Sequence, residues 1–248
     1  MNIGIDLDGT IYRSNTLIPG SKYAIDKLIE KNNLFFLTNN GSTPPTAILK
    51  KLNSLLDLKL EDKQIITPLL VAINYLSNLN KLIYVHADPN VKSYLKSFNL
   101  KITDELDNSE IALIGRISPF NYKLIKSFVD FYNNNGIIYA FNKDMTYPTD
   151  KGFEIGNGAL VKEIEEIIDS EINSFGKPEQ FYIDYLKKHS INLHYVVGDR
   201  VDTDIELGRA IGCHSVLVKT GVYNEADDVS NIPALKIFND LKSFSNSI

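Results

Sequence analysis

The chain has 248 residues, of which 44% are hydrophobic and 23% are charged, and its formal net charge is −5. This length suffices for one large domain, or two modest ones, with a substantial core. The acidic balance argues against a nucleic-acid partner, and the single cysteine, Cys213, excludes an intramolecular disulfide and a multi-cysteine metal site.

Strand-like and helix-like segments alternate along the chain. In chain order we expect a strand at 2–7, a helix at 21–33, a strand at 34–40, a helix at 43–56, a short strand and a helix within 63–79, a strand at 81–88, a helix at 90–100, a strand at 110–116, a helix at 120–134, a strand at 136–142, a helix at 158–169, and further elements of both kinds at 175–189, 193–199, 203–212 and 213–219. This βαβ repetition predicts an α/β fold in which helices flank a parallel sheet.

The N-terminal segment "MNIGIDLDGT" has no basic region followed by an apolar run, so we expect no signal peptide. Apolar runs such as "PLLVAI" are too short to span a bilayer. One unpaired cysteine fits a reducing compartment. The chain is therefore expected to be cytoplasmic and to have no membrane partner.

Ligands of open α/β sheets bind at the carboxyl ends of the strands. Four polar clusters follow predicted strands, namely "DLDGT", "TNNGS", "NKDMTYPTD" and "GDRVDTD". Any function is therefore expected to lie in these four segments.

Two of these clusters are acidic. Asp6 and Asp8 follow the first strand, and Asp199 follows the apolar run "HYVV". Solvated turns are the alternative interpretation, since Asp and Gly favour turns. Because buried strands end directly before Asp6 and Asp199, we favour a hard cation held by these carboxylates, such as Mg²⁺. Asp202 is better explained as a helix cap, whereas Asp204 is expected to support the metal site by hydrogen bonding.

The other candidates suit an anion. Thr38, Asn39 and Asn40 offer hydroxyl, amide and backbone N–H donors ahead of a helix, although a plain turn explains them equally well. Lys177 stands between Gly and Pro, where either a surface charge or a fixed phosphate ligand fits.

Together these groups favour phosphoryl transfer without a P-loop, because no "GxxxxGK[ST]" occurs. A carboxylate attacks phosphorus directly to form an acyl phosphate, which is the role we predict for Asp6. Asp8 is then expected to protonate the leaving oxygen and later to deprotonate water.

The motifs "DLDGT", "LTNNGS", "GKP" and "GDRVDTD", in this order, resemble those of the haloacid dehalogenase-like hydrolase superfamily. The flanking "YPTDKGFEIGNGALV" and "DLDGTIYR" resemble its p-nitrophenyl phosphatase and NagD-type branch. This resemblance covers nearly the whole chain. It implies a Rossmann-like core at 1–79 and 174–248 with an inserted α/β cap at 80–173.

The resemblance also assigns the site. It implies Mg²⁺ on the carboxylates of Asp6 and Asp199 and on the backbone carbonyl of Asp8. The implied phosphate ligands are Thr38, Asn39, Asn40 and Lys177, with Asp204 supporting the metal. Relatives often pair through the cap, so a homodimer through the cap is expected.

The cap sequence departs from its relatives. Arg116 stands in a stretch that often reads Gly-Leu-Asp, and Lys143 takes the proline position of Asn-Pro-Asp. Tyr147 falls where pyridoxal phosphatases tend to carry histidine. Arg116, Lys143, Asp144 and Tyr147 are therefore candidate specificity residues, and ordinary loop residues are an equally good interpretation.

The sequence thus predicts a Mg²⁺-dependent phosphatase of small phosphate monoesters that forms an aspartyl-phosphate. The substrates considered are p-nitrophenyl phosphate, sugar phosphates, nucleotides and phosphoglycolate. One alternative is a phosphotransferase or mutase with the same nucleophile. Another is a non-catalytic phosphate- or sugar-binding protein on this fold, which would not need Asp8. A nucleotide-dependent oxidoreductase is disfavoured because "GxGxxG" is missing.

Overall fold

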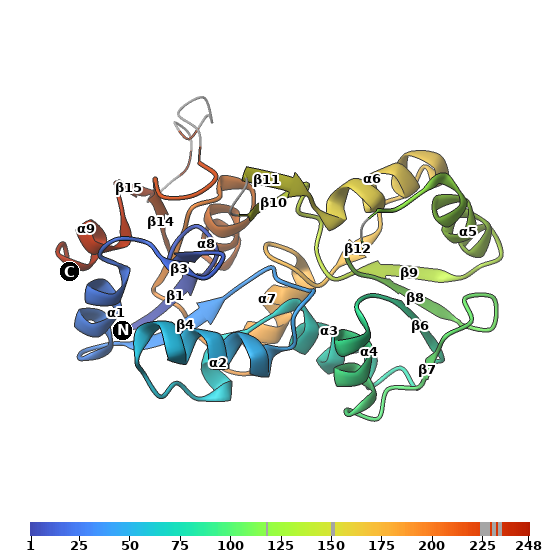
Figure 1. Ribbon diagram of the computed structural model, residues 1–248, viewed down its shortest axis with the longest axis horizontal. Coiled ribbons are helices and arrows are strands. Elements are labelled where there is room, and N and C mark those ends of the chain that lie inside the picture. Colours follow the sequence, from blue (N-terminus) through green and yellow to red (C-terminus); the bar gives the residue numbers. More distant parts are fainter. Residues whose placement is uncertain (118, 150–151, 224–228, 230–231, 233–234) are drawn as a thin grey trace.

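Two parallel sheets organise this computed structural model, which describes residues 1–117, 119–149, 152–223, 229, 232 and 235–248 (Figure 1). The first has six strands in the order β15-β14-β13-β1-β4-β5, and the second has five in the order β12-β9-β8-β6-β7. All pairings within both sheets are parallel. The predicted α/β fold is therefore confirmed. We call the first sheet with its helices the core, and the second with its helices the cap.

The core is built from both ends of the chain. Its strands are β1 (Asn2–Asp6), β4 (Asn33–Leu37), β5 (Ile65–Ile66), β13 (Tyr195–Gly198), β14 (His214–Val218) and β15 (Lys236–Phe238). Its helices are α1 (Ser21–Ile29), α2 (Pro45–Leu56), α3 (Pro68–Leu76), α7 (Gln180–Lys188), α8 (Glu206–Ile211) and α9 (Leu241–Ser245). Smaller elements are the hairpin β2 (Tyr12–Arg13) and β3 (Thr16–Leu17), the 3₁₀ turn η1 (Asp62–Gln64) and the π-helical turn η2 (Val201–Ile205).

Helices cover both faces of the core sheet, so its strands are apolar on both sides. In β4, Leu34 and Phe36 join the apolar cluster formed with α1, α2 and α9, whereas Leu37 joins a second cluster with α3 and α7. Such two-sided burial explains the continuous apolar runs of the sequence. It also leaves the strand ends as the natural place for polar groups.

The cap follows the same rules. Its strands are β6 (Ile83–His86), β7 (Ile102–Thr103), β8 (Ile111–Ile114), β9 (Ile137–Ala140) and β12 (Asn173–Ser174), and its helices are α4 (Pro89–Lys96), α5 (Tyr122–Asn133) and α6 (Asn157–Ile168). One face packs on α5 and α6. The other face shares an apolar cluster with α3 and α7 of the core, in which Tyr139 lies 5.4 Å from Phe175 between ring centroids. Packing within this shared cluster holds the cap against the core.

An antiparallel hairpin, β10 (Thr146–Thr149) and β11 (Gly152–Ile155), extends from the cap over the core beside α8 (Figure 1). The sequence predicted only a polar segment here. Its side chains are half-buried or exposed, with Phe153 58% and Ile155 60% exposed, so burial imposes no apolar pattern that reveals a strand.

The predicted boundaries of the cap at 80 and 173 stay a prediction, as does the homodimer through it. Ser118, Asp150 and Lys151, inside the predicted cap, lie outside the described residues. In the described part of the chain, no helix combines the length and the apolarity that crossing a bilayer requires.

Candidate active site

The carboxyl ends of three adjacent core strands bring the predicted site residues together. Asp6 is the last residue of β1, which lies between β13 and β4. Asp199 directly follows β13, and Thr38 directly follows β4. Lys177 arrives from the loop between β12 and α7. Residues separated by up to 193 positions thus share one edge of the sheet because parallel strands align their carboxyl ends.

Asp6, Asp199 and Asp204 form a buried acidic triad. Each offers a carboxylate oxygen, and these oxygens lie within 4.8 Å of one another. Asp204 lies on η2, one of the rare π turns that often mark functional sites, where the sequence predicted the start of a helix. Gly9 has a φ of 96°, and a Cβ there would lie 2.5 Å from Oδ2 of Asp199. The close approach of this loop to the triad therefore requires glycine.

Lys177 is buried against the triad. Its Nζ donates to Oδ1 of Asp6 at 2.8 Å and to Oδ1 of Asp204 at 2.6 Å. Burial opposes the ammonium charge, but the Asp204 and Asp6 carboxylates outweigh it and raise the pKa of Lys177. Lys177 is therefore a fixed cation and not the solvated surface charge that the sequence left open.

The acidic triad fits a divalent cation. Oδ2 of Asp6 is buried and has no hydrogen-bond partner among the described residues. Burial, together with the charges of Asp6 and Asp204, raises the pKa of Asp199 well above its usual range. Fully ionised, three carboxylates against the one Lys177 ammonium leave two negative charges in excess. Hard carboxylate oxygens with this excess are suited to Mg²⁺.

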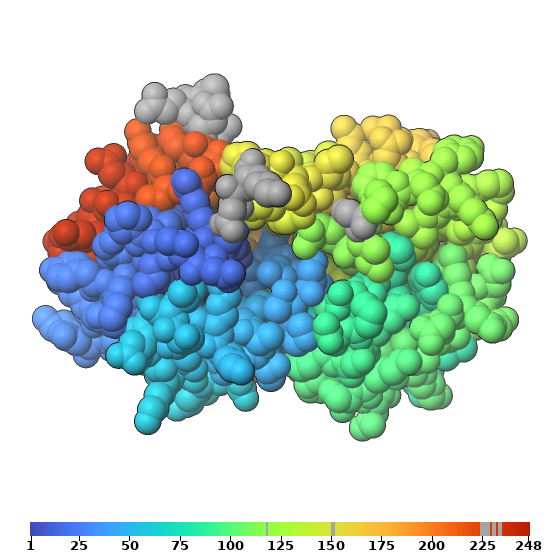
Figure 2. All heavy atoms as spheres, viewed as in Figure 1, coloured from blue at the N-terminus to red at the C-terminus, as the bar shows by residue number. Residues whose placement is uncertain are grey.

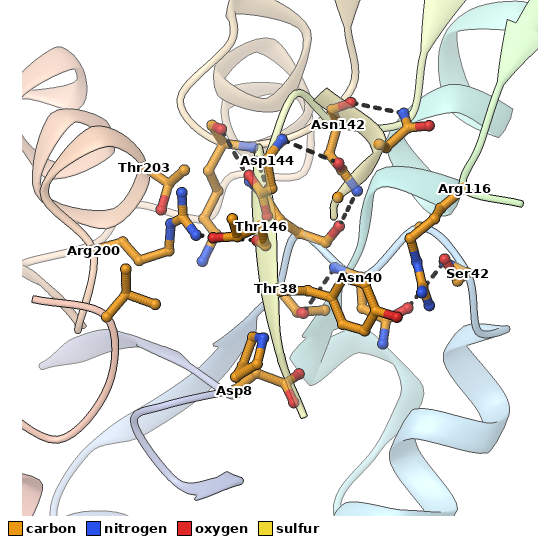
Figure 3. A pocket seen from close by; sticks show the side chains of 18 of the residues that line it. Asp8, Thr38, Asn40, Ser42, Arg116, Asn142, Asp144, Thr146, Arg200 and Thr203 are labelled. Atoms are coloured by element: carbon orange, nitrogen blue, oxygen red, sulfur yellow. Dashed lines mark hydrogen bonds between the residues drawn. The ribbon is translucent and has the colours of Figure 1, made fainter. Parts of the chain in front are cut away.

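Asp8 is half-buried and is not a member of the triad, but it lines the same pocket as Asp6 (Figure 3). Its carboxylate accepts a hydrogen bond from the Tyr12 side chain, and the Lys51 charge acts on it. Burial outweighs both and raises the pKa of Asp8. Burial raises the pKa of Asp6 as well, but Asp6 is bonded to the Lys177 ammonium, so the two carboxylates that open the sequence have different partners.

The "TNNGS" segment divides its groups between the pocket and the scaffold. The Thr38 hydroxyl accepts from the Asn40 N–H at 3.0 Å, and both residues line the pocket. The Asn39 amide, in contrast, accepts from Lys177 N–H at 2.7 Å and donates to Lys177 O at 3.2 Å and to Oδ1 of Asp144 at 2.9 Å. Both ends of the Asn39 side chain are therefore engaged within the scaffold.

The pocket lies between core and cap, and the surface is hollowed there beneath β10 and β11 (Figure 2). Arg116, Asp144 and Tyr147 of the cap candidates line it. Lys143 does not belong to its lining and instead pairs with Glu165 at 2.9 Å. The structure therefore separates Lys143 from the three other cap candidates.

Sequence reasoning missed several pocket residues. Two nitrogens of Arg200 donate to the Asp202 carboxylate at 3.1 and 2.7 Å, and a third nitrogen donates to Thr146 O of the hairpin at 3.4 Å. Asn142 donates to Asn39 O at 2.7 Å. Asn142 and Arg200 stand inside "NKDMTYPTD" and "GDRVDTD", so their position in polar clusters after strands was the available signal.

Comparison with known proteins agrees with this arrangement. Two family models match, one described as haloacid dehalogenase-like hydrolase over residues 3–101 and one as HAD-like hydrolase over residues 174–244. Together they take in both halves of the core and all four motifs. The chain belongs to the haloacid dehalogenase-like hydrolases. The predicted family and the predicted class of enzyme, a hydrolase, are thus confirmed.

Individual relatives carry phosphatase names. An acid sugar phosphatase of Staphylococcus epidermidis is 28% identical, with 96% of this chain and 93% of the relative covered. A double mutant of a thermostable NPPase from Geobacillus stearothermophilus is 27% identical with a TM-score of 0.81, covering 97% and 96%. The p-nitrophenyl phosphatase from Archaeoglobus fulgidus shares the fold at a TM-score of 0.86 and 24% identity, covering 100% and 98%. The predicted likeness to the p-nitrophenyl phosphatase and NagD-type branch of this superfamily is confirmed.

Proposed function

We propose that this hydrolase is a Mg²⁺-dependent phosphatase of small phosphate monoesters and that Asp6 is its nucleophile. One observation carries the proposal. The Asp6 carboxylate is held by Lys177 at Oδ1 while its buried Oδ2 has no hydrogen-bond partner in the described part of the chain, and Asp6 lines a pocket with Asp8 and Thr38. The phosphatase names of the relatives, and a glycerol phosphate phosphatase from Mycobacterium tuberculosis solved with magnesium at a TM-score of 0.83, agree with it.

The carboxylates of Asp6 and Asp199 would hold Mg²⁺, with Asp204 beside them. The ion supplies positive charge that neutralises the phosphoryl oxygens during transfer. Lys177 supplies a second fixed positive charge at the same edge of the sheet. Thr38 and the backbone N–H groups of the "TNNGS" segment would orient the phosphate.

The reaction would proceed in two displacements. In the first, an Asp6 carboxylate oxygen attacks phosphorus, the bond from phosphorus to the ester oxygen breaks, and Asp8 donates its proton to that oxygen. In the second, Asp8 takes a proton from water as the water attacks phosphorus. The bond from phosphorus to Asp6 then breaks, which releases phosphate and restores the Asp6 carboxylate. The raised pKa of Asp8 suits the donor role in the first displacement.

The test is phosphate release from p-nitrophenyl phosphate by the wild type, with Mg²⁺ and with excess EDTA, beside Asp6→Asn. Asp130→Asn is the matched control, because Asp130 is an exposed carboxylate on α5. We expect release that requires Mg²⁺, persists in Asp130→Asn and disappears in Asp6→Asn. Undiminished release from Asp6→Asn would refute the assigned nucleophile.

Product analysis separates the alternative functions. A phosphorylated second product in place of free phosphate would favour a phosphotransferase or mutase. Binding of phosphate esters without any turnover would favour the non-catalytic protein.

Acid quenching of Asp8→Asn during turnover, followed by mass spectrometry, should find the phosphoryl group on the peptide that contains Asp6, because loss of the base slows the second displacement.

A further inference from the structure

Three cations line the pocket, and their partners differ. Lys177 forms ion pairs with Asp6 and Asp204, and Arg200 forms an ion pair with Asp202. No carboxylate of the described residues lies within ion-pair distance of Arg116. Arg116 is therefore the pocket cation that forms no ion pair with the described part of the protein.

Arg116 is nevertheless held in place. Its guanidinium carbon lies 3.8 Å from the ring centroid of Tyr147, and the Tyr147 hydroxyl donates to Glu154 on the neighbouring strand of the hairpin. Stacking on the aromatic face and a hydrogen bond to the Tyr147 side chain restrain the guanidinium, and its other N–H groups stay available in the guanidinium plane. A side chain restrained before binding loses less entropy when a ligand arrives.

Arg116 also stands apart from the proposed phosphate ligands. It follows β8 of the cap, and its side chain points towards Ser42 and Asn40, across the pocket from Arg200 (Figure 3). The transferring phosphate already has the Lys177 charge and the proposed metal at the triad. A guanidinium on the cap side is placed to meet the other end of a substrate, which is its leaving group.

We propose that Arg116 binds a second anionic group on the leaving group, so that the preferred substrates are short phosphate esters that also carry a carboxylate or a second phosphate. This inference rests on the proposed phosphatase function. The guanidinium fork matches both anions through paired hydrogen bonds. The pocket volume of about 120 Å³ is well below the range of roughly 300–1,000 Å³ for drug-sized ligands, which favours a compact leaving group.

The test compares substrates that share a three-carbon skeleton. Wild type, Arg116→Met and Arg116→Lys are assayed for kcat/KM on 3-phosphoglycerate, glycerol 3-phosphate and propane-1,3-diol bisphosphate. The first carries a carboxylate, the second only hydroxyls, and the third a second phosphate. Lys143→Met is the matched control, since Lys143 is a neighbouring cap cation bound to Glu165 outside the pocket.

We expect wild type to prefer one of the doubly anionic esters over glycerol 3-phosphate by about 10- to 100-fold, as one charge-assisted hydrogen-bonded pair provides. Arg116→Met should abolish this preference, Arg116→Lys should retain part of it, and Lys143→Met should keep it. The better of the two anionic esters identifies the anion. No preference in wild type, or an equal loss on all three esters in Arg116→Met, would overturn the proposal, the latter because Arg116 would then serve the transferring phosphate.

Failure of the phosphatase function itself would be recognised separately, as absence of turnover of p-nitrophenyl phosphate by folded wild type with Mg²⁺. Calorimetric binding of 3-phosphoglycerate, the bisphosphate and glycerol 3-phosphate would then decide the matter. Tighter binding of a doubly anionic ester in wild type but not in Arg116→Met supports the role of Arg116, and equal binding in both proteins contradicts it.

Discussion

The ammonium of Lys177 lies 2.6 Å from the Asp204 carboxylate, and each of the two side chains is only 1% exposed. The contact joins the loop after the cap to the π-helical turn of the core. Two charges so deeply buried are stable only as partners, because removal of one leaves the other unpaired in a low dielectric. The pair therefore makes the stability of the fold depend on the electrostatics of the site.

Lys177→Met should lower the free energy of unfolding by about 3–5 kcal/mol, because the buried acidic triad loses the ammonium that is bonded to Asp6 and Asp204. Urea titrations in EDTA measure the change. The double variant Lys177→Met/Asp204→Asn should recover part of the loss, since it removes one of the stranded carboxylates. Additive losses in the double variant would show that the two side chains do not depend on each other.

Mg²⁺ should raise the melting temperature of the wild type and raise it far less in Asp199→Asn. At a free concentration of about 100 times its dissociation constant, a bound ion adds about 2.7 kcal/mol. For a chain of this size that amounts to roughly 5–10 °C. Asp202→Asn is the control because Asp202, 66% exposed at its side chain, is not part of the triad. An undiminished shift in Asp199→Asn would place the ion elsewhere.

Asp8→Asn should impair turnover by an amount that depends on the leaving group. An alkyl ester needs a proton on its leaving oxygen, whereas p-nitrophenolate leaves as a stable anion. With an alkyl ester we therefore expect the loss of about 10²–10⁴ in kcat that is typical of general acid–base catalysis. The first displacement of p-nitrophenyl phosphate, measured as a burst of p-nitrophenolate, should slow much less. Equal slowing of the first displacement for the alkyl ester and for p-nitrophenyl phosphate would argue against Asp8 as the acid.

The strand ends were predictable from the sequence because core strands buried on both faces read as unbroken apolar runs. Asp6 and Asp199 stand where such runs stop, so parallel topology predicted that both lie at the same edge of the sheet, and the pairing of β1 with β13 makes them neighbours. The hairpin β10–β11 was not predictable, since its half-buried and exposed residues carry no such pattern. The different places of Arg116 and Lys143 were equally hidden, because the ion pair that removes Lys143 from the pocket joins it to Glu165 on α6.

The role of Asn39 shows a further limit of sequence reasoning. Residue type indicated an anion ligand, yet the side-chain amide forms hydrogen bonds with the Lys177 backbone and with Asp144. Which of its hydrogen-bonding groups remain free depends on the loop conformation and on the cap, and neither is encoded locally. The motif therefore located the site, while the hydrogen-bond partners of each residue within it could be assigned only from the tertiary structure.

Asp144→Ala should loosen the cap over the core, because the Asn39 amide loses the acceptor that lies 2.9 Å away on the cap. Asp144→Asn keeps an acceptor oxygen and should be milder. Hydrogen exchange of the backbone amides at 142–147 should accelerate most in Asp144→Ala. KM for p-nitrophenyl phosphate should rise in the same order. Unchanged exchange with a raised KM would show that Asp144 acts on the substrate and not on cap closure.

His86, on β6, should make the cap less stable in acid. Burial first, and then the Lys92 charge, lowers the pKa of His86 below its usual 6.5, and its Nε2 is buried without a hydrogen-bond partner among the described residues. The unfolded chain therefore binds a proton near pH 6.5 that the folded chain refuses. The resulting loss in the free energy of unfolding is absent above that pH and grows as the pH falls below it.

His86→Phe should remove this cost and keep the aromatic contact with Phe128, whose ring centroid lies 5.9 Å away. Urea unfolding between about pH 7.5 and about pH 5.5 should show a smaller loss of stability in the variant than in wild type. The acidic triad titrates in the opposite sense, since burial raises the pKa of Asp204 to about 6, but it contributes equally to both proteins. The difference between the two pH profiles therefore isolates His86, and parallel profiles would mean that the folded cap accommodates the protonated ring.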